Sequence, residues 1–423
     1  MAALSPSTLT VRGAIRVPGD KSISHRALIL SAVAPGSSRI EHILDSADVQ
    51  STAGALRAMG ARIPPLSAKM YVEGGALARP RDPLDCGNSG TTTRLLAGVV
   101  AGAGLGATFI GDESLSRRPM RRVADPLRAM GARVELPPHG GLPMRVEGGR
   151  LSGIDYESSI ASAQIKSAIL LAAVISGVRA RVTEPHRSRD HTERMLAARG
   201  VEVHQVDATV SIPPAQQLKP ANVAVPADPS SAAFFIALGL LADAGELRLT
   251  DVCLNETRIG FLRVLQHMGA SLELVDRRDE GGETVGTIVA HPSRLKGIEI
   301  TEDEVPAMID ELPLFACIAS RARGESVVSG AGELRVKESD RIKAIVDNLR
   351  TLGAEAEELE DGFRITGTTT ALKGRVVTHG DHRIAMSFGI LGATAGNSIT
   401  VDDPGCVAVS FPAFWTELER VRS

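Results

Sequence analysis

The 423-residue sequence has no long apolar run and little net charge. Its longest apolar stretch, AAFFIALGLLA at Ala232–Ala242, is too short to span a bilayer. The N-terminal MAALSPSTLT has no basic region followed by an apolar run, so we expect no secretory signal. A net charge of −3 gives no overall attraction to nucleic acid or an anionic membrane, so any anion site must be local.

Paired cysteines are also absent. Cys86, Cys253, Cys317 and Cys406 lie far apart without a CxxC pair, which indicates a reducing compartment without disulfides or structural zinc. The cytoplasm is therefore the expected location. Lysine is scarce as well, with eight lysines against 39 arginines, so a lysine within a polar motif is notable.

A nucleotide-binding P-loop is absent, although GAIRVPGDKS at Gly13–Ser22 is superficially similar to one. Five residues separate Gly13 from Gly19, where the P-loop has four. Asp20 interrupts the Gly-Lys-Ser sequence and would repel a polyphosphate. Both the spacing and the chemistry exclude the P-loop.

What the sequence does contain is an internal repeat. An amphipathic helix that ends at a glycine and precedes a strand-like segment recurs at spacings of 71, 69, 69 and 84 residues. The closing glycines are Gly60, Gly131, Gly200, Gly269 and Gly353. Glycine after a helix is typical of a left-handed cap. The final AFWTELERVRS resembles the same helix, which predicts six copies of one α/β unit, the last without its closing strand.

Six units of about 70 residues are too many for one core, so we expect two domains of three units each. The Pro-containing stretches VPGD and VPADPS, near residues 17–21 and 225–230, are the expected crossings. Residues 18–227 would form the N-terminal-type domain, and residues 1–17 with 228–423 the C-terminal-type domain. A solenoid of interaction repeats is the alternative, but the polar motifs differ between units.

Two polar turns open apolar, helix-like runs. DKSISHR contains Lys21, Ser22, His25 and Arg26, and DCGNSGTTTR covers Asp85–Arg94. A helix N-terminus with basic and hydroxyl side chains can bind an anion. An ordinary solvated helix start, or a Ser/Thr N-cap, would explain either turn equally well.

Arginines and acid–base groups gather in further stretches. SLSRRPMRR has four arginines in six positions, typical of a solvated face but also suited to a carboxylate or phosphate. The others are SAQIKSA, SRDHTER, MIDELP, RVKESDR and GDHRIAM. RVKESDR alone would be unremarkable as an exposed helix start. His379 and His382 lack a third ligand at a sensible spacing, so we expect no metal site. Together these groups predict an enzyme that joins two small anionic substrates by acid–base chemistry without a cofactor.

In chain order, the motifs resemble those of the 5-enolpyruvylshikimate-3-phosphate synthases over essentially the whole chain. The matching stretches are PGDKSISHR, GNSGTTTR, RRPM, SAQIKSA, RDHTE, NETR, MIDELP, RVKESDR and DHRIAM. SAQIK, RDHTE and NETR are similar to the second class of that family rather than to the enterobacterial or plant type.

The resemblance implies the α/β enolpyruvyl transferase fold, an inside-out α/β barrel of two similar domains with three βαβαββ units each. It implies transfer of the enolpyruvyl group of phosphoenolpyruvate to the 5-hydroxyl of shikimate 3-phosphate through a tetrahedral intermediate, with release of phosphate. This reaction belongs to the shikimate pathway to chorismate and aromatic amino acids. No cofactor, no metal, no partners beyond the two substrates, and a monomer in the bacterial cytoplasm are implied as well.

The resemblance also implies a site, residue by residue. Shikimate 3-phosphate would be held by Lys21, Ser22, Arg26, Ser162, Ala163, Gln164, Arg189, Asp310 and Lys337. Phosphoenolpyruvate would be held by Lys21, Gly90, Arg118, Gln164, Arg341 and Arg383. Asp310 would accept the hydroxyl proton, and Glu338, with Lys21, would move a proton on and off the methylene carbon.

Three positions distinguish the sequence within that family. Val409 in VAVSFP stands where the first-class enzymes carry a lysine that contacts phosphoenolpyruvate. Near Arg189 the other class's shikimate-ring contact has no counterpart, and Ser188 stands in that region. Gly90, where an alanine would narrow the phosphoenolpyruvate pocket, predicts sensitivity to glyphosate.

Two other functions are alternatives to enolpyruvyl transfer to shikimate 3-phosphate. UDP-N-acetylglucosamine enolpyruvyl transferase shares fold and chemistry, but that family has a reactive cysteine in a loop that corresponds to GDESLSRRPM, which has none. A non-catalytic α/β repeat scaffold is the rival from a different class.

Overall fold

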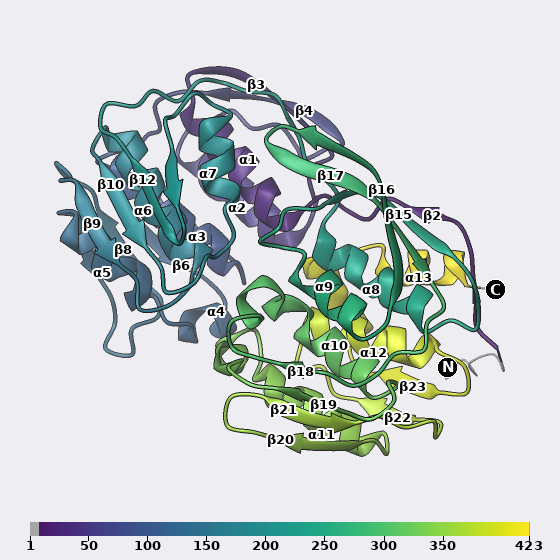
Figure 1. Cartoon of the computed structure of the whole chain (residues 1–423). Coiled ribbons are helices and arrows are strands. Elements are labelled where there is room, and N and C mark those ends of the chain that lie inside the picture. The colour runs from purple at the N-terminus through teal and green to yellow at the C-terminus, as the bar shows by residue number, and fades with distance from the viewer. Residues whose placement is uncertain (1–7, 423) are drawn as a thin grey trace. The chain divides into compact units, whose positions relative to one another are not determined.

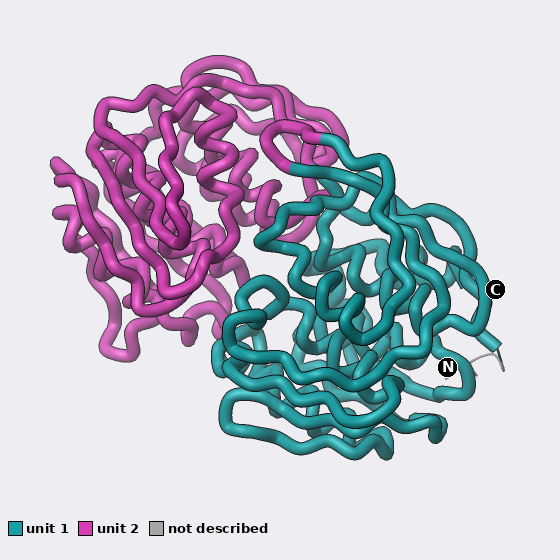
Figure 2. Tube along the Cα trace, in the orientation of Figure 1, with its two compact units in different colours: residues 1–18, 226–278, 284–423 teal, residues 19–225, 279–283 magenta. Residues whose placement is uncertain are grey.

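The computed structural model describes residues 8–422, in which the chain forms two compact units. Unit 1 contains the chain up to Pro18, Pro226–Arg278 and the residues from Thr284 onward; unit 2 contains Gly19–Val225 and Asp279–Glu283 (Figure 2). The sequence-based partition assigned residues 279–283 to the C-terminal-type domain, whereas in the structure they are part of unit 2. Residues 1–7 lie outside the described range. They include most of the N-terminal stretch in which we expected no secretory signal.

Unit 2 consists of seven helices and three sheets (Figure 1). Its helices are α1 (Lys21–Val33), α2 (Ala47–Ala58), α3 (Gly90–Gly102), α4 (Glu113–Arg117), α5 (Arg121–Ala129), α6 (Ala163–Ser176) and α7 (His191–Ala197). Its strands are β3 (Gly36–Glu41), β4 (Lys69–Gly74), β5 (Leu84–Asp85), β6 (Gly106–Ile110), β7 (Arg133–Glu135), β8 (Met144–Glu147), β9 (Ile154–Glu157), β10 (Ala180–Thr183), β11 (His204–Val206), β12 (Thr209–Ile212) and β13 (Val223–Ala224).

Unit 1 holds the remaining elements, two of whose strands extend into residues 279–283 of unit 2. Its helices are α8 (Pro229–Leu240), α9 (Gly260–His267), α10 (Leu312–Ala319), α11 (Arg341–Thr351), α12 (His382–Ala393) and α13 (Phe414–Val421), with short 3₁₀ helices η1 (Val305–Ala307), η2 (Ile309–Glu311), η3 (Gly332–Val336) and η4 (Pro404–Val409). Its strands are β1 (Thr10–Val11), β2 (Ala14–Ile15), β14 (Ala244–Gly245), β15 (Leu247–Cys253), β16 (Ser271–Glu280), β17 (Glu283–His291), β18 (Glu299–Ile300), β19 (Glu325–Val328), β20 (Glu355–Glu358), β21 (Phe363–Thr366), β22 (Lys373–Val376) and β23 (Ser398–Val401).

The sheets repeat one pattern of strand pairing. In β5-β6-β8-β7, β9-β10-β12-β11 and β18-β19-β21-β20, the first pair is parallel and the next two pairs are antiparallel. The sheets β13-β3-β4 and β2-β15-β17-β16 begin with the same parallel and antiparallel pairs. Among the described residues β22 and β23 form only the parallel pair. The recurrence confirms the expected repeat of one α/β unit with a shortened last copy.

The predicted cap glycines close the amphipathic helices. Gly60, Gly131, Gly200, Gly269 and Gly353 follow α2, α5, α7, α9 and α11, with φ of 88°, 106°, 82°, 95° and 94°. An L-residue with a side chain rarely adopts this left-handed conformation, which is why glycine recurs there. The sixth helix, predicted from AFWTELERVRS, is α13.

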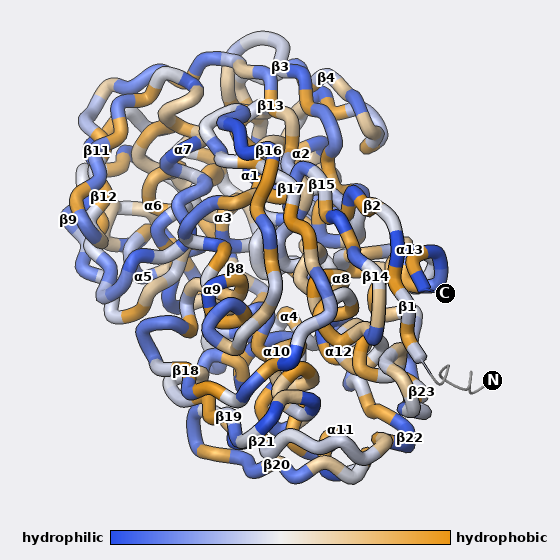
Figure 3. Tube along the Cα trace, turned by 45° about the vertical axis from the view of Figure 1, so that its right-hand side comes forward, coloured by the Kyte–Doolittle hydropathy of each residue, from blue (hydrophilic) through white to orange (hydrophobic). Residues whose placement is uncertain are grey.

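Apolar helices lie at the centre of each unit, and strands lie around them. Every residue of α8 and α10 is buried, and α8, α10 and α12 pack against one another (Figure 1). A helix that is hydrophobic on all sides must be buried on all sides. The strands instead mix hydrophobic and hydrophilic residues (Figure 3), as in β4, where buried and exposed residues alternate. No helix within residues 8–422 is long and apolar enough to cross a membrane.

In unit 2 the helices α3 and α6 pack with their backbones in contact. A Cβ on Gly98 would lie 2.2 Å from the Ala168 carbonyl oxygen, and one on Gly102 would lie 2.6 Å from the Ala172 carbonyl oxygen. Only glycine allows this approach, because any side chain on α3 at these positions would overlap the α6 backbone.

We expect Gly98→Ala to lower the free energy of unfolding by ~1–3 kcal/mol, because the added methyl group would overlap the backbone of α6, which cannot easily move aside. Equilibrium unfolding in urea measures the change. The matched control is Gly54→Ala in α2, where no described atom outside the helix lies within 4 Å of the new Cβ. There the substitution is expected to raise the free energy of unfolding by ~0.5–1 kcal/mol. Equal effects at both glycines would contradict the proposed close contact.

Candidate active site

The predicted anion-binding stretches begin helices. At α1, α3 and α12 the residue before the helix (Asp20, Ser89 or Asp381) accepts a backbone N–H through its side-chain oxygen, at 2.8, 3.1 and 2.9 Å. Unsatisfied N–H groups and the helix dipole favour an anion at such ends. Asp20, which excluded a P-loop, is therefore a capping residue. Asp228 of the second V-P-x-D stretch caps α8 in the same way, accepting the Ser230 N–H at 2.8 Å.

Lys21 and Arg26 extend from the first turns of α1. Lys21 forms an ion pair with Asp48 of α2. Arg26 is buried, and its guanidinium donates to the hydroxyls of Thr192 and Ser167, each at 2.7 Å. Arg26 thus joins α1 to α6 and α7, a structural role that the sequence did not indicate.

Arg26 and Arg189 both belong to unit 2. The pKa of Arg26 is lowered to about 10, mainly by burial; Glu193 and Asp20 act to raise it, and the charge of Arg189 acts to lower it. Both residues were predicted to bind shikimate 3-phosphate.

A chain of buried hydroxyls joins α1 to the N-terminus of α3. His25 Nδ1 lies 2.7 Å from Thr52 Oγ1, which lies 2.6 Å from Thr92 Oγ1, and the latter donates to Ser89 Oγ at 2.7 Å. Burial is the main reason that the pKa of His25 is lowered to about 3, so the imidazole is neutral near pH 7. His25 therefore supplies hydrogen bonding rather than charge.

Two arginines converge on Gly90. A Cβ on Gly90 would lie 2.6 Å from Arg94 Nη1 and 3.6 Å from Arg118 Nη1. Arg94 Nη1 donates to Gln164 Oε1 at 2.7 Å, and Gln164 Nε2 donates to Thr91 Oγ1 at 2.9 Å. The predicted residues Gly90, Arg118 and Gln164 thus lie together. Arg94 was not among the residues predicted from the sequence, where its place at the end of DCGNSGTTTR is the one signal that points to it.

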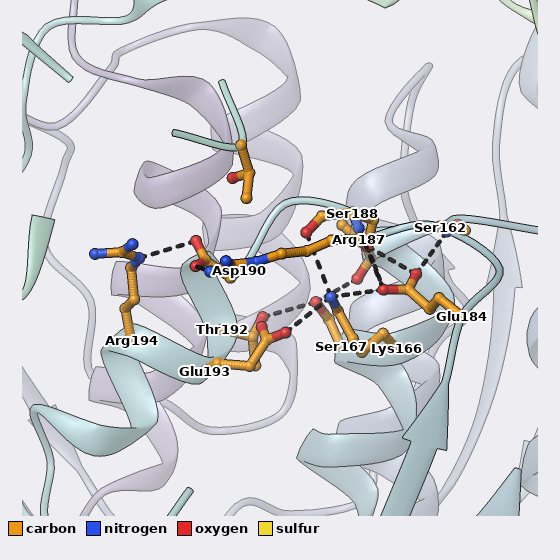
Figure 4. A network of polar contacts seen from close by, with 12 residues as sticks. Ser162, Lys166, Ser167, Glu184, Arg187, Ser188, Asp190, Thr192, Glu193 and Arg194 are labelled. Carbon is orange, nitrogen blue, oxygen red and sulfur yellow. Dashed lines mark hydrogen bonds and ion pairs between the residues drawn. The ribbon is translucent and has the colours of Figure 1, made fainter. Parts of the chain in front are cut away.

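The predicted residues Ser162, Ala163 and Gln164 form the start of α6. The Ser162 N–H donates to Glu184 Oε1 at 2.8 Å, and Glu184 is part of a buried polar network below this helix end (Figure 4). Arg189 lies between Ser188 and Asp190 on the segment that leads into α7. Both segments are thus anchored from inside the unit.

In unit 1, Arg341 is the centre of a buried ion network. Its Nε and Nη2 donate to Asp381 at 2.8 and 3.3 Å, and its Nη2 also donates to Glu338 Oε2 at 2.6 Å. Arg341 is only 1% exposed. Burial opposes its charge, but Asp381 and Glu338 raise its pKa above the usual value. The exposed helix start considered for RVKESDR is wrong at this residue.

Asp310 lies beside both arginines of unit 1. Its carboxylate oxygens are 3.7 Å from Arg341 Nη1 and 3.9 Å from Arg383 Nη2, and its carbonyl oxygen accepts from Arg383 Nη1 at 3.1 Å. The next residue, Glu311, is buried, accepts from Ser230 Oγ and lies 3.7 Å from Arg383. Unit 1 therefore collects the predicted residues Asp310, Glu338, Arg341 and Arg383.

The remaining predicted positions are less enclosed. Lys337 is half-buried directly after η3, and Val409 is half-buried at the end of η4. Cys86 is buried and its thiol pKa is raised to about 12, mainly by burial. Within residues 8–422 no three His, Cys, Asp or Glu side chains are grouped to hold a metal ion.

The fold is that of the enolpyruvyl transferases. The solved EPSP synthase of Acinetobacter baumannii is 40% identical, with a TM-score of 0.87 over 99% of this chain and 97% of that chain. The enolpyruvyl transferase NikO of Streptomyces tendae is 19% identical, with a TM-score of 0.77 over 99% of this chain and 96% of that chain, and shares the fold. The predicted fold class is confirmed.

The chain belongs to the EPSP synthase (3-phosphoshikimate 1-carboxyvinyltransferase) family, whose model matches residues 7–418. The 3-phosphoshikimate 1-carboxyvinyltransferase of Sulfurihydrogenibium sp. (strain YO3AOP1) is 47% identical over 419 residues, 97% of each chain. That of Bacillus subtilis (strain 168) is 44% identical over 417 residues, also 97% of each chain. The predicted family is confirmed, and these matches favour neither the UDP-N-acetylglucosamine enzyme nor a repeat scaffold.

The Arg341–Asp381 pair predicts a pH dependence of stability. Despite burial, the charge of Arg341 lowers the pKa of Asp381 below 3.8. The stabilisation from this pair is therefore present above about pH 4 and is lost as the pH falls through the folded-state pKa. We expect Asp381→Asn to lower the free energy of unfolding at pH 7 by ~3–5 kcal/mol and to weaken the acid dependence of stability.

Urea unfolding of both proteins at several pH values between 3 and 7 measures this difference. Asp155→Asn is the control, because Asp155 forms an exposed pair with Arg179 and its loss should change stability little. An Asp381→Asn variant with the same acid profile as the wild type would contradict the prediction.

Proposed function

We propose that the protein transfers the enolpyruvyl group of phosphoenolpyruvate to the 5-hydroxyl of shikimate 3-phosphate and releases phosphate. This is the step of the shikimate pathway that leads to chorismate and the aromatic amino acids. The main support for the proposal is the match of the EPSP synthase family model to residues 7–418. The charged groups described above agree with two anionic substrates and with proton transfer.

Shikimate 3-phosphate is proposed to bind Lys21, Ser22, Arg26, Ser162, Ala163, Gln164, Arg189, Asp310 and Lys337. Arg26 and Arg189 both belong to unit 2, and their two positive charges support an anionic ligand there. Ser22 and Ser162 add donors at the N-terminal ends of α1 and α6.

Phosphoenolpyruvate is proposed to bind Lys21, Gly90, Arg118, Gln164, Arg341 and Arg383. At Gly90 the missing side chain lets two guanidinium groups approach the helix N-terminus. The buried Nη1 of Arg341 makes no hydrogen bond within residues 8–422, so it retains donors for a ligand oxygen. Arg94, which holds Gln164, is proposed as a supporting residue of the same place.

The proposed chemistry needs an acid and a base at the same time. Asp310 accepts the proton of the 5-hydroxyl as its oxygen bonds to C2 of phosphoenolpyruvate, and Glu338, with Lys21, supplies a proton to the methylene carbon. The tetrahedral intermediate then returns a proton from that carbon and loses phosphate. Each well-placed acid or base contributes roughly 10²–10⁴-fold to the rate. The paired arginines hold the leaving phosphate and offset its charge.

Phosphate release tests the proposal directly. Release should require shikimate 3-phosphate and phosphoenolpyruvate together and should be absent with either alone. Release with UDP-N-acetylglucosamine in place of shikimate 3-phosphate would replace the proposal with its rival.

Asp310→Asn is expected to lower kcat by roughly 10²-fold or more while changing both KM values little, because the amide retains the shape but cannot take a proton. Asp347→Asn in α11 is the control, since Asp347 forms an exposed pair with Lys343 and should leave turnover unchanged. A large rise in KM with nearly normal kcat would mean that Asp310 positions substrate rather than abstracts a proton.

Glyphosate is expected to inhibit the wild type in competition with phosphoenolpyruvate. Gly90→Ala should weaken this inhibition, because its Cβ would lie 2.6 Å from Arg94 Nη1 and that guanidinium would have to shift from its place beside Gly90. Inhibition constants of both proteins, measured at several phosphoenolpyruvate concentrations, check the prediction. Wild-type inhibition only at millimolar glyphosate, or equal constants in both proteins, would contradict it.

The proposal extends to a monomer that acts in the bacterial cytoplasm on these two small molecules. Sedimentation velocity with and without both substrates measures the oligomeric state. A dimer at micromolar protein concentration would correct that part of the proposal.

A further inference from the structure

A buried lysine lies between two glutamates in unit 2. Lys166 Nζ is 2.7 Å from Glu184 Oε2 and 2.9 Å from Glu193 Oε1 (Figure 4). The three side chains are 2%, 1% and 4% exposed. We name Lys166, Glu184 and Glu193 the lysine cluster. None of them was assigned a role by the sequence or by the proposed reaction.

The charges of the lysine cluster are balanced by a neighbour. Burial opposes the charge of Lys166, but Glu193 and Glu184 more than offset this and raise its pKa above the usual value. The negative charge of Glu193 also raises the pKa of Arg26 against the effect of burial. Two carboxylates therefore face two cations. Buried ions persist only when they are compensated in this way.

Glu184 does more than pair with Lys166. Its carboxylate accepts the Ser162 N–H at 2.8 Å and the Ser188 hydroxyl at 2.7 and 2.8 Å from its two oxygens. The Ser188 N–H lies 3.4 Å from the same group. Ser162 begins the segment of α6 that the proposed function assigns to shikimate 3-phosphate, and Ser188 directly precedes Arg189. One carboxylate thus holds two substrate-binding segments.

The other side of Arg189 is held as well. Asp190 accepts from Arg187 Nη2 at 2.6 Å and from Arg194 Nε at 2.9 Å (Figure 4). Arg189 consequently lies between two residues whose side chains are fixed. Glu184 is the cluster member whose carboxylate bonds to both Ser162 and Ser188. Lys166 supports the same two residues through their carbonyl oxygens, donating from its backbone N–H to Ser162 at 3.1 Å and from Nζ to Ser188 at 3.5 Å.

We propose that Glu184 is a positioning residue for shikimate 3-phosphate and that Lys166 is the counter-ion that keeps it charged. Glu184 acts through Ser162 and Arg189, without touching the substrate. An apolar core of the same volume would be at least as stable as a buried ion cluster, so stability alone does not explain it. The inference rests on the proposed function, of which it is a refinement.

The test is Glu184→Gln, which preserves size but removes the charge and one hydrogen-bond acceptor. We expect the KM for shikimate 3-phosphate to rise roughly 10- to 100-fold, since a buried N–H or hydroxyl loses its partner. The KM for phosphoenolpyruvate should change less than about twofold, and kcat should fall less than the shikimate 3-phosphate KM rises.

Glu193→Gln is the matched comparison. It removes the other carboxylate from the same lysine, but Glu193 has no bond to Ser162 or Ser188 among the described contacts. The proposal is supported if Glu193→Gln loses as much stability as Glu184→Gln but raises the shikimate 3-phosphate KM clearly less. Equal rises in the shikimate 3-phosphate KM for both variants would overturn it, because the effect would then follow buried charge alone.

Ser188→Ala covers the case in which Glu184→Gln does not fold. It leaves the Lys166–Glu184 pair and the weaker contact of the Ser188 N–H in place, and removes the two short hydroxyl contacts that join Glu184 to the Arg189 segment. A rise of roughly 3- to 10-fold in the shikimate 3-phosphate KM is expected. An unchanged KM in this variant overturns the proposal.

A double-mutant cycle with Arg189→Ala separates positioning from general weakening. If Glu184 acts partly through Arg189, the combined rise in the shikimate 3-phosphate KM is smaller than the product of the two single rises. A combined rise equal to the product of the two single rises would show that Glu184 does not act through Arg189. Phosphate release by the wild type separates a failure of the proposed function from a failure of this inference. If the wild type releases no phosphate with both substrates, the proposed function and the inference both fail. If the wild type releases phosphate normally but Glu184→Gln leaves the shikimate 3-phosphate KM unchanged, the inference alone is overturned.

Discussion

The backbone contact between α3 and α6 is the constraint on which the anion-binding part of unit 2 depends. Because Gly98 and Gly102 let the two helices touch, their N-termini at Gly90 and Ala163 are fixed relative to each other. Gln164 can then bridge Arg94 and Thr91, and the two arginines converge on Gly90. A wider helix spacing would remove these hydrogen bonds even if every polar residue were retained.

Local signals made much of the fold predictable from the sequence. Some sequence signals do not depend on tertiary contacts. Examples are a glycine with positive φ after a helix, such as Gly131, and an acidic residue directly before a helix, such as Asp20. The repeat multiplied these signals and predicted two domains built from one α/β unit, whereas the enolpyruvyl transferase fold came from the resemblance. The roles of the site residues, in contrast, came from resemblance rather than from spacing.

Partners that are distant in the sequence were not predictable. Arg94 and Gln164 are 70 residues apart, and Lys166 and Glu184 are 18 apart on different elements. No periodicity relates such pairs, because packing of the elements brings them together. Arg341 shows the same limit, since RVKESDR is typical of a surface, yet the guanidinium is enclosed by Asp381 and Glu338.

The division of the chain into discontinuous units has a consequence during synthesis on the ribosome. Strand β2 emerges before its partner β15, with which it pairs through Ala14 and Arg248, so it waits for some 230 further residues. In the same way His191 of unit 2 meets its partner Glu283 only 92 residues later, after residues 226–278 of unit 1 have been synthesised. Non-local pairing of this kind slows folding. Neither unit can be completed in order of translation, because the segment of β2 lacks β15 and His191 lacks Glu283 until later residues arrive.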